Sequence, residues 1–192
     1  MIWIRCRFIN RNEELKVAIK EVVKYPAKVL EEKCKEVTVF DEKLHQLLED
    51  MYDTMMATEG IGIAAPQIGE SVQVAIVDMG DGQDVIEMIN PEVVQIGGTD
   101  TDIEGCLSFP DLYGEVERPY YVKIEAQERD GSIYELEAED YTARAILHEI
   151  DHLNGVLFNT KIKRIVTLEE LEEIEREVEE MEELLERQGE EA

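Results

Sequence analysis

Two of the chain's three histidines stand four residues apart in the stretch LHEIDHLNG, residues 147–155. At this spacing two imidazoles lie on one face of an α-helix, one turn apart, so both can reach a single metal ion. Glu149 directly follows the first histidine, and a carboxylate in that position suits a general base. A metal centre on this helix needs a third ligand from elsewhere in the chain, and the identity of that ligand separates one class of hydrolase from another.

Cys106 is the best remaining candidate for the third ligand. Zinc peptidases with the H-E-x-x-H pattern usually take it from a downstream histidine or acid. No histidine follows His152 here, and the downstream acids crowd a solvated tail. The stretch EGCLSFP places Cys106 in a turn-like position after a strand, although a lone cysteine is more often a small buried hydrophobe. A thiolate with two imidazoles would leave one coordination position for water, as in catalytic rather than structural sites.

The composition narrows the class of protein. A chain of 192 residues is long enough for one domain with a proper core. The net charge of -27, from 46 acidic and 19 basic residues, repels phosphate backbones and argues against general nucleic-acid binding. No apolar run approaches the length that crosses a bilayer. Three widely spaced cysteines without a secretory signal indicate a reducing cytosol.

The hydrophobic pattern predicts two helices separated by strands. Leucines and methionines at helical spacing indicate a helix that Asp41 caps and Gly60 ends, and the histidine-bearing helix is expected from Tyr141 to Leu153. The turn signals GDGQD and RDG predict hairpins, and hence largely antiparallel pairing. The runs expected to form strands are VQVAIVDM, VIEMINPEVVQIGG, YYVKIEAQERDG and SIYELEAED.

The two ends differ from the middle of the chain. Residues 1–16 begin with MIWIRCRFINRN, which carries three arginines and no acid, and we interpret them as a non-native or disordered extension. Residues 17–166 then form the catalytic domain, and residues 167–192 an acidic C-terminal helix. Thr167 and Glu170 make a capping box at the start of that helix. Its apolar seam predicts a helix that lies on the domain or on a twin subunit.

Three short motifs, in order, resemble those of the peptide deformylase family: GIGIAAPQ, EGCLS and HEIDH. The similarity runs from about Val22 to Phe158 and includes VKYPAKVL near its start and YGEVERP after the cysteine motif. The resemblance implies an α+β fold, with antiparallel sheets around a central helix that bears the H-E-x-x-H motif. It also implies the activity of the family, which removes the N-formyl group from the initiator methionine of nascent bacterial and organellar chains.

Carried onto this sequence, the resemblance implies that Cys106, His148 and His152 hold one divalent metal ion. Glu149 would take a proton from metal-bound water and pass it to the departing amine. Family members usually work with Fe²⁺, and this ligand set permits it. The order of intrinsic affinities favours Zn²⁺, Ni²⁺ or Co²⁺ as replacements on purification.

Further positions match the family's oxyanion and support residues. The resemblance implies that Gln67 and the backbone N–H of Leu107 stabilise the tetrahedral oxyanion, and that Gly62 contacts the backbone of the peptide. Glu104 and Arg118 match a paired acid and base in the family. We expect them to form a buried ion pair that steadies the cysteine loop rather than takes part in the chemistry.

A pocket for the methionine side chain is expected beside the first histidine. Ala145 lies one turn and Tyr141 two turns before His148 on the same helix face, and we expect both to line this pocket with Ile61. One position departs from the family, which usually has glutamine directly before H-E-x-x-H. Leu147 stands there and makes no amide hydrogen bonds.

The expected substrates are N-formylmethionyl nascent peptides at the ribosome, in a bacterial-type cytoplasm, without membrane binding and with the protein a monomer or weak homodimer. Two other hypotheses stay open at this stage. One is a peptidase of the H-E-x-x-H type with an unrecognised third ligand. The other is a metal-binding protein without turnover, or a deformylase relative that has lost activity and serves only as a binding module. Release of formate from a formyl-Met-Ala peptide would separate both from a deformylase.

Overall fold

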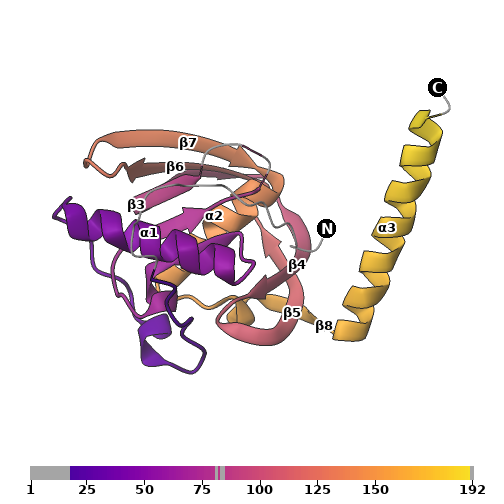
Figure 1. Ribbon diagram of the computed structural model, residues 1–192, viewed down its shortest axis with the longest axis horizontal. Coiled ribbons are helices and arrows are strands. Elements are labelled where there is room, and N and C mark those ends of the chain that lie inside the picture. The colour runs from indigo at the N-terminus through magenta and orange to yellow at the C-terminus, as the bar shows by residue number, and fades with distance from the viewer. Residues whose placement is uncertain (1–17, 81, 83–84, 191–192) are drawn as a thin grey trace.

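The computed structural model describes residues 18–80, 82 and 85–190, and Figure 1 shows how its elements are arranged. The proposed extension, residues 1–16, lies outside the described residues. In chain order the elements are η1 (Lys28–Glu31), α1 (Glu42–Ala57), β1 (Gly62–Ala64), η2 (Ala65–Ile68), β2 (Val74–Val77), β3 (Ile86–Gly97), β4 (Asp100–Cys106), β5 (Phe109–Arg118), β6 (Tyr121–Gln127), β7 (Ile133–Glu139), α2 (Asp140–Leu153), η3 (Phe158–Thr160), β8 (Ile162–Val166) and α3 (Leu168–Glu190).

The strands form two antiparallel sheets, as the expected α+β fold requires. One sheet has the order β1-β2-β3-β6-β7 and the other the order β4-β5-β8. The four predicted strand runs correspond to β2, β3, β6 and β7, and the RDG turn joins β6 to β7 as a hairpin. The predicted α+β architecture with antiparallel sheets is therefore confirmed.

Helices α1 and α2 cover opposite faces of the five-stranded sheet (Figure 1). Successive side chains of a strand point to opposite faces, so alternate residues of β2 join different cores. Ala75 packs in the core beneath α2, whereas Ile76 packs in the core beneath α1. The core beneath α1 also contains the predicted leucine and methionine stripe, namely Leu44, Leu48, Met51 and Met55.

Both helix predictions hold to within a residue or two at each end. The Asp41 side chain accepts hydrogen bonds from the backbone N–H groups of Lys43 and Leu44, so it caps α1 as expected. Helix α2 packs against β1, β2, β6 and β7 and ends at Leu153. One face of α2 is therefore committed to the apolar core, and the other face is available for the polar site. The residues of α2 in that core are Ala143, Ala145, Ile146, Ile150 and Leu153.

The hydrophobic pattern of the sequence did not predict the second sheet, β4-β5-β8. Strands β4 and β5 lack a clean apolar alternation, because Gly105 and Gly114 occupy positions where the strands approach closely, and β8 is only five residues long. A Cβ built on Gly105 would lie 2.8 Å from a ring carbon of Tyr113, and one on Gly114 would lie 2.6 Å from a methyl carbon of Ile162. Only glycine fits at these contacts, so the apolar alternation that marks a strand is interrupted there.

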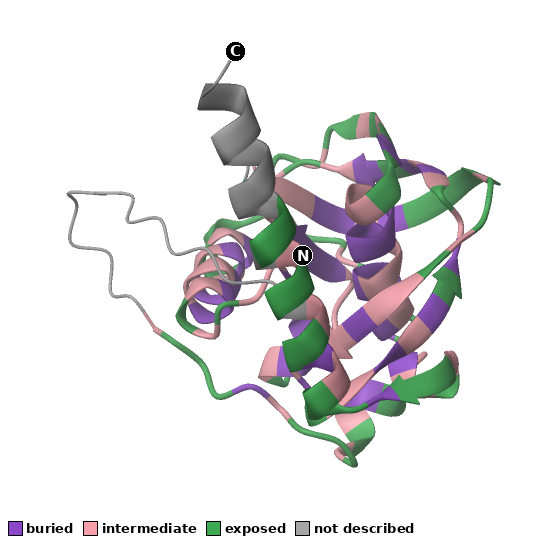
Figure 2. Ribbon diagram, turned by 90° about the vertical axis from the view of Figure 1, so that its right-hand side faces the viewer, coloured by how far each residue is buried: buried purple, intermediate pink, exposed green. Residues whose placement is uncertain are grey.

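Helix α3 starts with the expected capping box and projects away from the sheets (Figure 1). Leu171 in its first turns is buried, but Met181 is 62% exposed, and the described turns are mostly solvent-exposed in Figure 2. The helix therefore does not lie along the domain beyond its first turns, and the other alternative, contact with a twin subunit, stays a prediction. Among the described residues, no helix combines the length and apolarity needed to cross a membrane.

Candidate metal centre

Three predicted ligands converge between the end of β4 and helix α2. Cys106 is the last residue of β4, and His148 and His152 lie one turn apart on α2. One ligand atom from each residue lies within 4.8 Å of the other two, and Cys106 Sγ is 3.2 Å from His152 Nε2. The centroids of the imidazole rings are 5.1 Å apart. A sulfur and two ring nitrogens at this separation can surround one ion and match the donor set of a catalytic metal site.

The cysteine loop is held in place by a segment near the start of the described chain. Leu107 and Ser108 form the turn between β4 and β5, and the Tyr25 backbone N–H donates to the Ser108 carbonyl at 3.0 Å. Lys24 Nζ donates to the Leu107 carbonyl at 2.5 Å. The Tyr25 ring stacks on Phe109 with centroids 5.0 Å apart. These contacts fix the direction in which the end of β4 presents Cys106.

Glu149 lies buried beside the ligands with one carboxylate oxygen unused. Its Oε2 has no hydrogen-bond partner among the described residues, and the side chain is 4% exposed. A Cβ built on Gly62 would lie 2.5 Å from Glu149 Oε1, so only glycine leaves room for this carboxylate. Burial raises the pKa of Glu149 to about 7, despite the opposing charge of His148. A carboxylate with this pKa and a free oxygen is suited to accept a proton from water.

The surroundings of the histidines favour a cation. Burial would lower the pKa of His148, but hydrogen bonds with Cys106 and Glu104 raise it to about 10. Burial holds the pKa of His152 well below its usual range, so this ring is neutral and its nitrogens can serve as ligands. These features fit a divalent ion between the Cys106 sulfur and the two rings.

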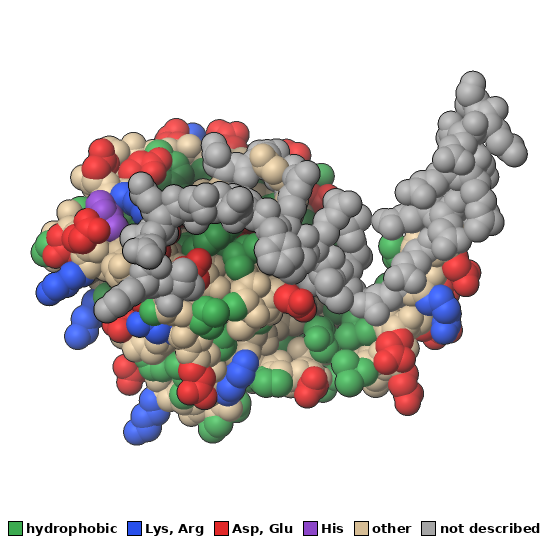
Figure 3. Space-filling model, viewed as in Figure 1, with side chains coloured by type: hydrophobic (Ala, Val, Ile, Leu, Met, Phe, Trp, Pro, Cys, Tyr) green, Lys and Arg blue, Asp and Glu red, His purple; other side chains and the backbone are tan. Residues whose placement is uncertain are grey.

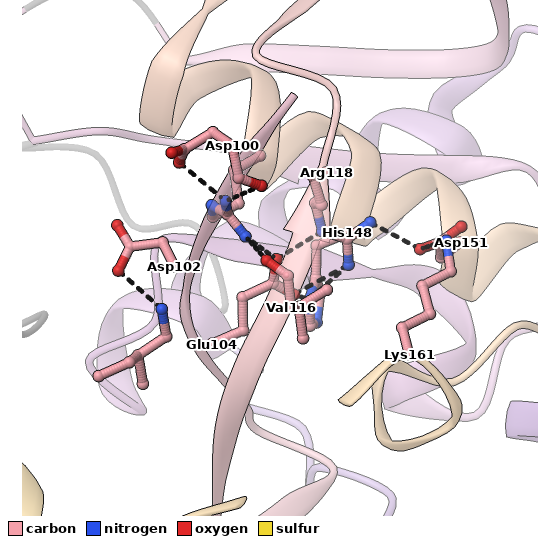
Figure 4. Close-up of polar contacts among 10 residues, drawn as sticks. Asp100, Asp102, Glu104, Val116, Arg118, His148, Asp151 and Lys161 are labelled. Atoms are coloured by element: carbon pink, nitrogen blue, oxygen red, sulfur yellow. Dashed lines mark hydrogen bonds and ion pairs between the residues drawn. The ribbon is translucent and has the colours of Figure 1, made fainter. Parts of the chain in front are cut away.

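A buried carboxylate orients the first histidine. Glu104 Oε2 lies 3.0 Å from His148 Nδ1, and because a carboxylate only accepts hydrogen bonds, Nδ1 carries the proton and Nε2 is left for the metal. Arg118 donates to both oxygens of Glu104, at 2.5 Å and 2.9 Å (Figure 4). Burial alone would raise the pKa of Glu104, but hydrogen bonds from His148 and Arg118 hold it well below its usual range. The predicted ion pair is therefore present and buried.

This ion pair belongs to a larger network that the sequence did not reveal. Arg118 Nη1 also donates to Asp151 at 2.8 Å, and Asp151 in turn pairs with Lys161 at 2.6 Å (Figure 4). Arg144, on α2, donates to Glu104 Oε1 at 2.8 Å. Arg144 was missed because an arginine between two alanines of a helix has the pattern of a solvated position.

Gln67 points its amide group at the cysteine. It is 1% exposed, and its Oε1 accepts the backbone N–H of Ala64 at 2.8 Å, which fixes the side chain. Its Nε2 lies 3.7 Å from Cys106 Sγ and 3.4 Å from Ser108 Oγ. The amide hydrogens are therefore directed toward the place where the three ligand atoms converge, as an oxyanion donor requires.

The comparisons with known proteins agree with this geometry. A family model described as Polypeptide deformylase matches residues 19–168. The chain belongs to the peptide deformylase family. The peptide deformylase 1 of Bacillus anthracis is 54% identical over 155 residues, which cover 81% of this chain and 99% of that protein. The peptide deformylase 1 of Bacillus subtilis is 52% identical, covering 81% of this chain and 97% of that protein.

Solved structures of deformylases have the same fold. The crystal structure of the enzyme from Thermotoga maritima superposes with a TM-score of 0.73 at 40% identity, covering 76% of this chain and 98% of that one. The crystal structure of the enzyme from Synechococcus elongatus, in complex with actinonin, superposes with a TM-score of 0.72 at 34% identity. The match covers 79% of this chain and 88% of that one. As a deformylase, the protein is a metal-dependent hydrolase that removes the N-formyl group from the N-terminal methionine of polypeptides.

The three residues expected to line a methionine pocket lie near α2 in different surroundings. Ala145 is 5% exposed in the core, and Ile61 packs against the edge of that core. Tyr141 is half-buried and hydrogen-bonds to Asp102 on β4, and its burial and that bond raise its pKa. A cavity of about 480 Å³ lies elsewhere, lined by Val77, Met79, Tyr134, Leu136 and Thr142 among others.

Leu147, which stands where deformylases usually have glutamine, is partly buried against the core beneath α2. Its side chain therefore contributes apolar packing at this position.

Proposed function

We propose that Cys106, His148 and His152 hold one divalent metal ion in this deformylase, with Fe²⁺ as the ion in the cell. The observation that carries the proposal is the convergence of the three ligand atoms within 4.8 Å, beside the unpartnered Oε2 of Glu149. Zn²⁺, Ni²⁺ or Co²⁺ would replace iron during purification, because intrinsic affinity for such a site rises from iron toward nickel and zinc.

The metal would supply Lewis-acid activation of the attacking water and of the formyl carbonyl. Glu149 takes the proton of that water, because its carboxylate is buried beside the ligands and has a free oxygen. The same carboxylate then gives the proton to the nitrogen of the departing amine. Gln67 Nε2 and the Leu107 N–H donate to the formyl oxygen as negative charge develops on it.

The substrate peptide would lie beside β1. This strand is at one end of the five-stranded sheet and pairs with β2 alone among the described strands. The backbone of Gly62 is therefore placed to hydrogen-bond the peptide while Glu149 lies against its α-carbon. Ile61, Tyr141 and Ala145 are the residues we assign to the pocket for the methionine side chain.

We assign the deformylase domain to residues 17–166, with residues 1–16 as an extension and residues 167–192 as an acidic C-terminal helix. The protein would act on nascent N-formylmethionyl peptides at the ribosome, in a bacterial-type cytoplasm, as a monomer or weak homodimer. Acidic side chains are spread over the face seen in Figure 3, in keeping with the net charge of -27, so we expect no general nucleic-acid binding.

The test is release of formate from formyl-Met-Ala peptide by protein purified and loaded with Fe²⁺ without oxygen. Cys106→Ser should lose nearly all turnover and hold far less than one metal ion per chain. Retention of full activity and stoichiometric metal by Cys106→Ser would contradict the ligand assignment and point to a different third ligand.

A further inference from the structure

The proposed ligand set joins two parts of the fold that have separate packing. His148 and His152 lie on α2, which packs against strands of the five-stranded sheet. Cys106 ends β4, which belongs to the three-stranded sheet. A shift of a few tenths of an ångström between α2 and β4 would change the distances between the sulfur and the ring nitrogens, so the site needs a rigid connection between them.

Arg144 makes that connection from α2. It lies one turn before His148 on the same helix face, and its side chain is 6% exposed. Its Nη1 donates to Glu104 Oε1 on β4 and to the Val116 carbonyl on β5, both at 2.8 Å. Its Nη2 donates to Asp100 Oδ2 at 3.0 Å. One guanidinium thus binds both strands of the β4–β5 hairpin whose turn follows Cys106.

Arg144 also determines how the carboxylate of Glu104 is shared. Glu104 Oε1 accepts from Arg144 and from Arg118 Nε, which leaves Oε2 to Arg118 Nη2 and His148 Nδ1. Burying an arginine is costly unless it is fully paired, and helix stability alone does not require a charge at this position. The geometry of the contacts is better explained by a role in holding Glu104 against the histidine.

We propose that Arg144 is a positioning residue of the metal centre. It fixes Glu104, and through it the His148 ring, and it ties α2 to the strand that carries Cys106. This inference rests on the proposed ligand set. Among the described residues, Arg144 hydrogen-bonds to Glu104, Val116 and Asp100 and not to the ligands or Glu149, so it acts through Glu104 and the hairpin.

The experiment uses the full-length protein loaded with Co²⁺, whose absorption spectrum reports ligand geometry. Wild type is compared with Arg144→Met, Arg144→Lys and Asp100→Asn, and with Arg164→Met as a matched control. Arg164 lies exposed on β8, where it pairs with Glu115 and Glu170. Each variant is tested, well below its Tm, for the rate of metal loss to a chelator, the Co²⁺ spectrum, kcat and KM.

Arg144→Met should lose metal about 10- to 100-fold faster than wild type, with altered Co²⁺ bands and a lower kcat at little-changed KM, because residues that orient metal ligands have effects of this size. Arg144→Lys keeps a charge but cannot bind both strands, so its effect should lie in between. Asp100→Asn should show a smaller change in the same direction, and Arg164→Met none.

A merely structural role would lower the Tm of Arg144→Met and leave its spectrum and metal loss like those of wild type, and this result would overturn the inference. If Arg144→Met does not fold, the metal-loss rate, Co²⁺ spectrum, kcat and KM of Asp100→Asn test the positioning role instead. Cys106→Ala is measured in the same series. If it holds metal as tightly as wild type, the ligand assignment itself fails, which is a different outcome from an unchanged Arg144→Met.

Discussion

Two arginine–glutamate pairs in this protein have the same chemistry and different surroundings. Arg118 donates two hydrogen bonds to Glu104, and Arg129 donates two to Glu87. The first pair has side chains 3% and 5% exposed, whereas the second has side chains 36% and 21% exposed. Arg129 also pairs with Glu49 of α1, so it braces the β6–β7 hairpin against that helix.

The two pairs differ in whether water can solvate the charge that remains when one partner is removed. An exposed charge returns to water, so surface pairs are worth ~0–1 kcal/mol. A buried charge without its partner stays desolvated, so breaking a buried pair costs ~3–5 kcal/mol. Such pairs are not an efficient way to stabilise a fold, and the retention of the Arg118–Glu104 pair is better explained by its contact with His148. The buried pair serves the metal centre, and the partly exposed Arg129–Glu87 pair serves the scaffold.

The largest difference should appear in stability. Arg118→Met removes both of its hydrogen bonds to Glu104 and the one to Asp151, so the buried charge of Glu104 is only partly paired, and we expect Tm to fall by about 6–20 °C. Arg129→Met should change Tm by less than about 4 °C, since water solvates the glutamates that it frees. Thermal unfolding of both variants, followed by circular dichroism, makes the comparison. Equal losses in the two variants would show that burial does not distinguish the pairs.

The next difference should appear in metal retention. Glu104→Gln keeps the shape of the side chain but removes the charge that holds His148 Nδ1, so metal affinity should fall about 10- to 100-fold. Glu87→Gln, the partly exposed counterpart, should bind metal like wild type. Competition with a chelator under anaerobic conditions measures both. A wild-type affinity in Glu104→Gln would mean that the carboxylate does not support the ligand.

The smallest expected difference is in the response of stability to acid. The pKa of Glu104 in the folded protein is held well below its ordinary value of 4.5. At a pH between the folded-state pKa and 4.5, Glu104 is protonated in the unfolded chain but ionised in the folded protein. Glu104 therefore contributes stability that is present above about pH 4.5 and is lost as the pH falls. Glu104→Gln should therefore show a shallower fall of Tm below pH 4.5 than wild type. A curve parallel to that of wild type would indicate that other carboxylates dominate.

The same contrast explains what could be predicted from the sequence. Helices α1 and α2 and strands β2, β3, β6 and β7 follow from apolar periodicity and capping residues, because their packing is hydrophobic and repeats along the chain. Cys106, His148 and His152 could be singled out because their residue types and spacing specify metal chemistry. Their convergence within 4.8 Å depends on the β4–β5 hairpin. This hairpin could not be recognised in the sequence, because its glycines and acids interrupt the apolar alternation of its strands.

The support of the site was harder to predict. Glu104 and Arg118 were found only through the resemblance, and Arg144 was not found. Charged residues in a strand or helix normally face water, and a sequence contains no local signal that a charge will be buried with a partner 40 residues away. What the apolar stripe of α3 packs against could not be predicted either, because the stripe itself does not identify the surface that covers it.

The most direct test of the central claim is Glu149→Gln, with metal content and kcat measured on one anaerobic preparation. The amide keeps the shape of the side chain but cannot shuttle a proton. We expect metal content near that of wild type and kcat lower by at least about 10²–10⁴, with inhibitor affinity little changed. A variant that keeps more than about a tenth of wild-type kcat would contradict the proton-transfer role. A variant that loses its metal would show that Glu149 supports the site instead.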